Sequence, residues 1–141
     1  MYDIENSIGF LLSKSYQRGF GLFREQLDPY GITPPQFSLL AFLWQEDWLS
    51  QVELSERTQI DRTTLCGLID RLEKAGVVER RPNPGDRRSY LICLTSRGKE
   101  LEETLSTLAE QTIERFTAGL SAGDRSDLVR ILGLLRGEPR V

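Results

Sequence analysis

The residues of this sequence best suited to binding chemistry are four arginines, two before and two after one short turn. Arg80 and Arg81 precede the letters PNPGD, and Arg87 and Arg88 follow them at once. A guanidinium group keeps its positive charge at every physiological pH and forms paired hydrogen bonds with phosphate oxygens. Because prolines and a glycine restrict the backbone of the turn, the loop can present these charges in a defined shape. This spacing indicates binding to a phosphate backbone.

Charge is unevenly distributed along the 141 residues, whose formal net charge is −3. Residues 57–99 include ten basic and five acidic side chains, whereas the other positions include eight basic and sixteen acidic ones. A basic middle section between acidic ends favours a polyanion as the partner of the middle section. The acidic ends favour contact with protein or solvent.

The side chains on which most enzymes depend are scarce. The sequence has no histidine, which removes the commonest general base, the usual metal ligand and any Ser-His or Cys-His pair. We find neither a phosphate-binding glycine loop nor the paired-cysteine spacing of a zinc site. The sequence therefore predicts a protein that is not an enzyme, with no catalytic residue, no metal site and no cofactor.

Two cysteines, Cys66 and Cys93, are too few for a disulfide framework. No apolar run is long enough to span a membrane, and the acidic start does not have the pattern of a signal peptide. A cytoplasmic protein is therefore expected. We interpret Cys66 as a small surface residue, with control by oxidation as the alternative, and Cys93 as a packing residue within a β-rich run.

Periodic apolar residues predict the helices that must position the charged groups. The first is expected from Ile4 to Leu27 with Asp3 as its cap, and the second begins after Thr33, with Pro34 in its first turn. Ser50 caps a short third helix.

The clearest helix is expected between Asp61, its cap, and Gly76, which follows its C-terminus. Leucine and isoleucine line one of its faces. The opposite face has polar or small residues, namely Arg62, Thr63, Thr64, Cys66, Gly67, Asp70 and Arg71.

The runs VVERR and SYLICLT on either side of PNPGD predict a β-hairpin with an arginine-rich tip. Thr95 caps the next helix, whose apolar residues continue to Leu120. Ser121 and Asp124 then have the spacing of a capping box and open a last helix through Leu135.

This order of elements predicts a mainly α fold with a small β wing. A helix-turn-helix is followed by a two-stranded hairpin, and in such motifs the second helix lies in the major groove of DNA. The arginine-rich tip can enter the minor groove, where the negative potential is enhanced. A winged helix-turn-helix between helical ends is therefore expected.

The segment IDRTTLCGLIDRLEKAGVVERRPNPGDRRSYLICLTSRG resembles the core of the MarR family of winged-helix transcriptional regulators. The shared features are the DRLEKAGVVER run, Asp86-Arg87-Arg88 in the position of the D-x-R signature of the wing, and the letters LT followed by a glycine at the start of a long helix. The resemblance covers essentially the whole chain, including GITPPQFSLL.

The resemblance implies a single MarR-type domain over residues 1–141. The winged helix-turn-helix would occupy about 33–95, and the helices at about 3–30 and 96–138 would form the dimerisation region. It implies a homodimer that binds a pseudo-palindromic operator in double-stranded DNA and acts as a repressor released by a small aromatic or phenolic effector. The alternative is a winged-helix protein-interaction module that has lost DNA binding, which Gly67 and the net negative charge favour.

The resemblance also implies roles for individual residues. DNA contacts are expected at Arg62, Thr63, Thr64, Gly67, Arg71, Arg87 and Arg88, and Asp86 is expected to hold the wing in shape. Many relatives carry an arginine where this chain has Gly67, so a paired contact with guanine is missing there. An effector pocket is expected among Tyr16, Phe20, Phe37 and Trp44, with Trp48 as a further candidate, and core packing is the alternative for each.

Overall fold

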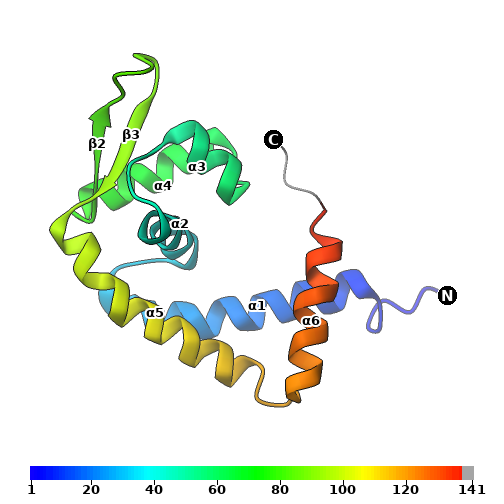
Figure 1. Cartoon of the computed structure of the whole chain (residues 1–141). Helices are drawn as coiled ribbons and strands as arrows, with labels where there is room; N and C mark the ends of the chain where they lie inside the picture. Colours follow the sequence, from blue (N-terminus) through cyan, green and yellow to red (C-terminus); the bar gives the residue numbers. More distant parts are fainter. Residues whose placement is uncertain (138–141) are drawn as a thin grey trace.

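The structure, a computed structural model, describes residues 1–137. Its elements follow the expected order, and the mainly α fold with a small β wing is confirmed (Figure 1). The elements are α1 (Ile8–Leu27), the 3₁₀ turn η1 (Asp28–Tyr30), α2 (Pro34–Gln45), β1 (Leu49–Ser50), α3 (Gln51–Thr58), α4 (Arg62–Lys74), β2 (Val78–Pro82), β3 (Tyr90–Leu94), α5 (Ser96–Phe116) and α6 (Ala122–Leu135).

Most helix starts lie where the sequence predicts them, because each is set by a local hydrogen bond. Thr33 accepts from the backbone N–H of Gln36, and the Gln36 side chain accepts from the backbone N–H of Thr33. In the same way, a side-chain oxygen accepts a hydrogen bond from the backbone N–H three residues later at Ser50, Asp61, Thr95 and Ser121. At the end of α4, Gly76 has the positive φ of 75° that glycine adopts most readily.

The start of the first helix was predicted wrongly. Ser7, not Asp3, caps α1, because its hydroxyl accepts from the N–H of Phe10. Asp3 instead accepts from the side-chain amide of Asn6 at 2.8 Å. Ile4 fits the apolar period but lies before the first helical turn.

Two further differences concern short segments. Strand β1, of two residues, was not predicted, since two residues are too few to show a period of two. The helix capped by Thr95 ends at Phe116, so Leu120 lies in the turn before α6.

The core lies between α2, α3, α4 and the sheet. Fully buried leucines and isoleucines from all of these elements meet there, with Leu27 of α1 and Leu105 of α5 at its edge. The sheet is antiparallel in the order β1-β3-β2, with Arg80 opposite Ile92 and Pro82 opposite Tyr90. The hairpin therefore stands on a well-packed base.

Outside this core, α1 and α5 lie along each other, and α6 rises from the end of α5 that is far from the hairpin (Figure 1). No residue of α6 is buried, and the only buried residue of α1 is Leu27 at its C-terminal end. Within residues 1–137, no helix combines the length and the apolar character needed to cross a bilayer.

The cysteine in β3 is a packing residue, as predicted. Cys93 is buried, and its thiol donates to the backbone oxygen of Glu79 at 3.4 Å. Burial, and then the nearby charges of Glu79 and Asp47, raise the pKa of the Cys93 thiol. A buried thiol with a raised pKa is a poor nucleophile, because the thiolate is the reactive form.

Candidate nucleic-acid interface

Helix α4 separates its residues cleanly into a core face and a surface face. Its four buried side chains are Leu65, Leu68, Ile69 and Leu72. The expected DNA-contacting residues lie on the other side, with Gly67 partly covered and Arg62, Thr63, Thr64 and Arg71 exposed. The structure therefore brings these five residues together on one accessible helix face.

The two arginines of this face are available to a ligand. In the described part of the chain neither Arg62 nor Arg71 forms an ion pair, although Asp70 is adjacent to Arg71 in the sequence. Asp70 instead binds Arg80. Among residues 1–137, no carboxylate neutralises the positive charges of Arg62 and Arg71.

The first turn of α4 is tightly organised by Asp61. One carboxylate oxygen accepts from the backbone N–H of Thr64 at 2.9 Å, and the other accepts from the Thr64 hydroxyl at 2.8 Å. These two hydrogen bonds, the backbone one first, lower the pKa of the Asp61 carboxyl. Because its hydroxyl proton is engaged, Thr64 can offer DNA only acceptor lone pairs while this cap persists.

The wing tip is held by a succession of local hydrogen bonds. The side-chain oxygen of Asn83 accepts from the N–H of Gly85 at 3.0 Å, and Asp86 accepts from the N–H of Arg88 at 2.9 Å. The backbone oxygen of Asp86 also accepts from the N–H of Ser89 at 3.2 Å. On the other side, the N–H of Asp86 donates to the backbone oxygen of Asn83 at 3.2 Å. Asp86 thus connects both sides of the tip, which is the geometry expected of a residue that shapes the wing.

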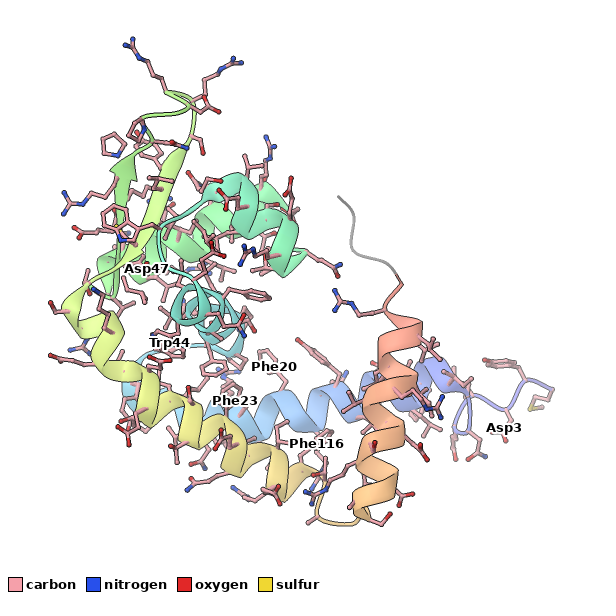
Figure 2. The ribbon with its side chains drawn as sticks, in the orientation of Figure 1. Asp3, Phe20, Phe23, Trp44, Asp47 and Phe116 are labelled. Atoms are coloured by element: carbon pink, nitrogen blue, oxygen red, sulfur yellow. The ribbon has the colours of Figure 1, made fainter. Side chains whose placement is uncertain are left out.

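The four arginines of the hairpin fall into two groups. Arg80 is bound to Asp70 and Glu73 of α4, and Arg81 pairs with Glu79 of its own strand at 3.1 Å. Arg87 and Arg88 are exposed and form no ion pair among the described residues. Side chains at the hairpin tip project away from the body (Figure 2). Of these four arginines, Arg87 and Arg88 are therefore the two that are free to bind an external phosphate.

The environment of Arg80 favours its charged form. Partial burial of the guanidinium lowers the pKa of Arg80, but hydrogen bonds and charge interactions with Asp70 and then Glu73 outweigh this effect. The pKa consequently lies above its ordinary value. Sequence reasoning grouped Arg80 with the phosphate-binding arginines, because its carboxylate partners lie on a different element.

Gly67 is not required by packing. A Cβ built at this position would meet no atom within 4 Å. Alanine is about 1 kcal/mol more favourable than glycine inside a helix. Gly67 therefore weakens α4 without any packing reason in the single subunit, and it leaves open space beside the exposed face.

We predict that Gly67→Ala stabilises the protein by about 1 kcal/mol in urea unfolding and weakens binding to operator DNA. The stability gain follows from helix propensity, and the loss of affinity follows if DNA approaches the backbone at this position. Gly21→Ala is the matched control, because Gly21 lies inside α1 and is equally open. It should give the same gain in stability. Operator affinity of Gly67→Ala equal to that of the parent would contradict close approach at Gly67.

The expected pocket residues form two aromatic groups between α1, α2 and α5. Tyr16 and Phe20 have ring centroids 5.8 Å apart, while Phe37 contacts Phe23 at 4.8 Å and Trp44 at 5.8 Å. Figure 2 shows Phe20, Phe23 and Trp44 in this region. Phe23, which the sequence did not single out as a pocket residue, packs against the core as well as against Phe37.

The aromatic side chains differ in how firmly they are held. Trp44 is half-buried and donates its indole N–H to the backbone oxygen of Gly98 at 2.9 Å, whereas Tyr16 is 68% exposed. Trp48 lies beyond the end of α2, is exposed, and takes no part in these ring pairs. Trp44 is consequently the best-anchored of the expected pocket residues.

Comparison with known proteins gives a consistent result. Residues 32–90 match the sequence model of the MarR family. The chain is 37% identical over 135 residues to the HTH-type transcriptional repressor NicR of Pseudomonas putida, with coverage of 96% of this chain and 84% of NicR.

Two solved structures are also similar to this chain. BpsR of Bordetella bronchiseptica, whose DNA binding is regulated by 6-hydroxynicotinic acid, has a TM-score of 0.91 at 30% identity and covers 98% of this chain and 99% of its own. A single-residue variant of MarR from Escherichia coli complexed with operator DNA has a TM-score of 0.85 at 31% identity, with coverage of 91% and 92%.

Proposed function

Because the chain belongs to the MarR family and is an effector-responsive, DNA-binding transcriptional regulator, not an enzyme, we propose that it is a homodimeric repressor. In this proposal a small aromatic or phenolic molecule releases it from a pseudo-palindromic operator in the cytoplasm. The alternative of an interaction module without DNA binding is set aside, since the relatives described above are DNA-binding regulators.

The apolar surface of α1 and α6 supports the dimer. Ile8 and Leu11 of α1 are 73% and 49% exposed, and Val129 and Leu134 of α6 are 74% and 73% exposed. Large apolar side chains exposed in such number on two helices mark an interaction site in a protein that has no membrane-spanning helix among its described residues. A second copy of the chain would cover both helices at once.

This assignment divides the single domain, 1–141, by role. Residues 33–95 form the DNA-binding region, and 3–30 with 96–138 form the dimerisation region, of which residue 138 lies outside the described residues. A two-fold dimer would present its two α4 helices to half-sites about one helical turn apart, ~34 Å.

We assign DNA contacts in two groups. Arg62, Thr63, Thr64, Gly67 and Arg71 would face the major groove, and Arg87 and Arg88 would reach the minor groove and its phosphates. The observation that carries this assignment is the free, shaped wing tip, in which Asp86 holds the backbone of Arg88.

The effector-binding site is assigned to the aromatic groups that include Tyr16, Phe20, Phe37 and Trp44. A planar acid or phenol can stack on such rings. The regulation of BpsR by 6-hydroxynicotinic acid supports a hydroxylated aromatic acid as the first probe. If this assignment is correct, 6-hydroxynicotinic acid releases the operator, and Phe37→Ala raises the concentration that is needed.

The test of the wing assignment is operator affinity as a function of salt, with a duplex that the parent protein selects from a random-sequence pool. We predict that Arg88→Ala weakens binding about tenfold on all sequences. The salt slope of log K should fall by about 0.9 for each lost phosphate contact, and so by about twice that in a dimer. Thr63→Ala should instead cost more on operator than on random DNA.

Two variants of Asp86 distinguish its effect on the shape of the wing from the effect of its negative charge on DNA binding. Asp86→Ala removes the acceptor of the Arg88 N–H, so it should weaken binding although it removes a negative charge near phosphates. Asp86→Asn keeps an oxygen acceptor in place and should bind at least as well as the parent. Tighter binding by Asp86→Ala would show that charge, not loop shape, decides the role of Asp86.

A further inference from the structure

Within the exposed face of α4, one stripe of residues contacts the wing. Cys66, Asp70 and Glu73 are spaced by four and three residues, so they lie in one stripe along the helix. The guanidinium of Arg80 in β2 reaches all three. Its nitrogens lie 2.6 Å from an Asp70 oxygen, 3.0 Å from a Glu73 oxygen and 3.4 Å from the backbone oxygen of Cys66.

The backbone strengthens the same connection. The N–H of Arg80 donates to the second oxygen of Glu73 at 3.1 Å, so one carboxylate binds both the main chain and the side chain of β2. The Arg80 side chain is only 17% exposed, whereas those of Asp70 and Glu73 are 55% and 42% exposed. Ion pairs with such exposed partners add little to stability. Their geometric effect is the more important one.

We propose that Arg80 is a positioning residue, which holds the wing at a fixed angle to α4 so that both enter the DNA as one rigid unit. The proposal rests on the assignment of α4 and the wing tip as DNA contacts. Arg81 cannot share this role, because it pairs with Glu79 on its own strand. Arg80 is thus the residue of β2 nearest the tip that is tied to α4 by its side chain.

The length of the hairpin makes this restraint important. The tip at Gly85 lies five residues beyond Arg80, which is about 17 Å in extended chain. A rotation of about 10° at Arg80 would therefore displace the tip by about 3 Å, which is the length of a hydrogen bond. Phosphate contacts at Arg87 and Arg88 would not survive such a displacement.

The contacts require a guanidinium group. Its planar fork offers several donors in fixed directions and can bind two carboxylates and a carbonyl together. A lysine ammonium carries the same charge on one nitrogen and cannot reach partners so far apart along α4. Charge and geometry can consequently be separated by a conservative substitution.

The first arm of the experiment uses Asp70→Ala, which leaves Arg80 and its charge in place. Simple electrostatics predicts tighter DNA binding, because a carboxylate next to the DNA-facing helix is lost. Loss of positioning predicts weaker binding, by about five- to tenfold. Glu56→Ala, at an exposed position of α3, calibrates the effect of removing one carboxylate. Binding by Asp70→Ala that is equal to or tighter than that of the parent would overturn the proposal.

The second arm uses Arg80→Lys and Arg80→Gln, with folding verified by circular dichroism and urea unfolding. Both should weaken operator binding about as much as Asp70→Ala, and Arg80→Gln should keep the salt slope of the parent. If Arg80→Lys bound the operator as tightly as the parent, the role of Arg80 would be explained by its charge alone. A slope lowered by about 0.9 per subunit in Arg80→Gln would make Arg80 a direct phosphate contact. Either result would refute positioning.

These outcomes are distinct from failure of the proposed function. If the parent selects no duplex from the pool, or if Arg88→Ala binds like the parent, the DNA-contact assignment itself is wrong. If the parent binds and Arg88→Ala is weakened while Asp70→Ala and Arg80→Lys bind normally, only the positioning role of Arg80 fails.

Discussion

Gly98→Ala is expected to destabilise the protein by about 3 kcal/mol, which is a large part of the 5–15 kcal/mol that holds a typical domain folded. A Cβ at position 98 would overlap the backbone oxygen of Val77 and would approach a methyl group of Leu94 at 3.2 Å. The Val77 oxygen cannot move freely, because it accepts from the backbone N–H of Thr95 at 3.1 Å.

The conflict lies where three elements meet. Gly98 is in the first turn of α5, and its oxygen accepts from the indole N–H of Trp44 in α2. Moving the turn outward to admit a methyl group would therefore break a second contact. Urea unfolding measures the loss, with Gly21→Ala as the control for the same substitution at an open helical position. A Gly98→Ala protein as stable as the parent would show that α5 does not pack this closely on Val77.

Leu11→Asp is expected to abolish the dimer at micromolar concentration and to reduce operator affinity by at least about 100-fold, or about 2.7 kcal/mol. In the lone subunit Leu11 is half exposed, so the change should cost little folding stability. In a dimer that covers α1, the new carboxylate would be buried without a partner, which costs several kcal/mol. Sedimentation at several concentrations, followed by operator titration, measures both effects.

Ser13→Asp supplies the matched control. It adds the same charge to the same helix two residues away, and two residues correspond to about 200° of rotation around α1, so Ser13 lies on the opposite side. This variant should remain dimeric and bind DNA like the parent. A monomeric Leu11→Asp protein with full operator affinity would contradict the paired half-sites, and an unchanged dimer would place the interface elsewhere.

The sequence predicted well wherever the deciding interaction is local. The caps at Thr33, Asp61 and Thr95 are hydrogen bonds across three residues, so the residue types at two nearby positions settle them. The failure at Asp3 has the same cause, because Asp3 and Ser7 are both good caps four residues apart. Ile4 and Ile8 fit the same apolar period, so the pattern could not choose between the two starts.

The candidate site was predicted in outline for a related reason. The buried stripe of α4 has the period of a helix, so the composition of its exposed face could be derived before the fold was known. The exposed tip of the wing was equally predictable, because proline, glycine and aspartate favour turns at the surface. These properties depend on residues within a few positions of one another.

What the sequence by itself determined is therefore the order of the elements, most of their ends and the residues on each exposed face, since short-range hydrogen bonds and apolar period control all three. The tertiary structure alone decided which arginines remain free. Arg80 and Arg88 have the same charge and lie at similar distances from the turn. Arg80 is neutralised by carboxylates on α4, whereas Arg88 has no carboxylate partner among residues 1–137. It also decided that Gly98 must lack a side chain while Gly67 need not. The reason is that ion pairing and close packing act between atoms that are adjacent in space, and the sequence contains no direct record of which distant residues the fold brings within 3 or 4 Å of each other.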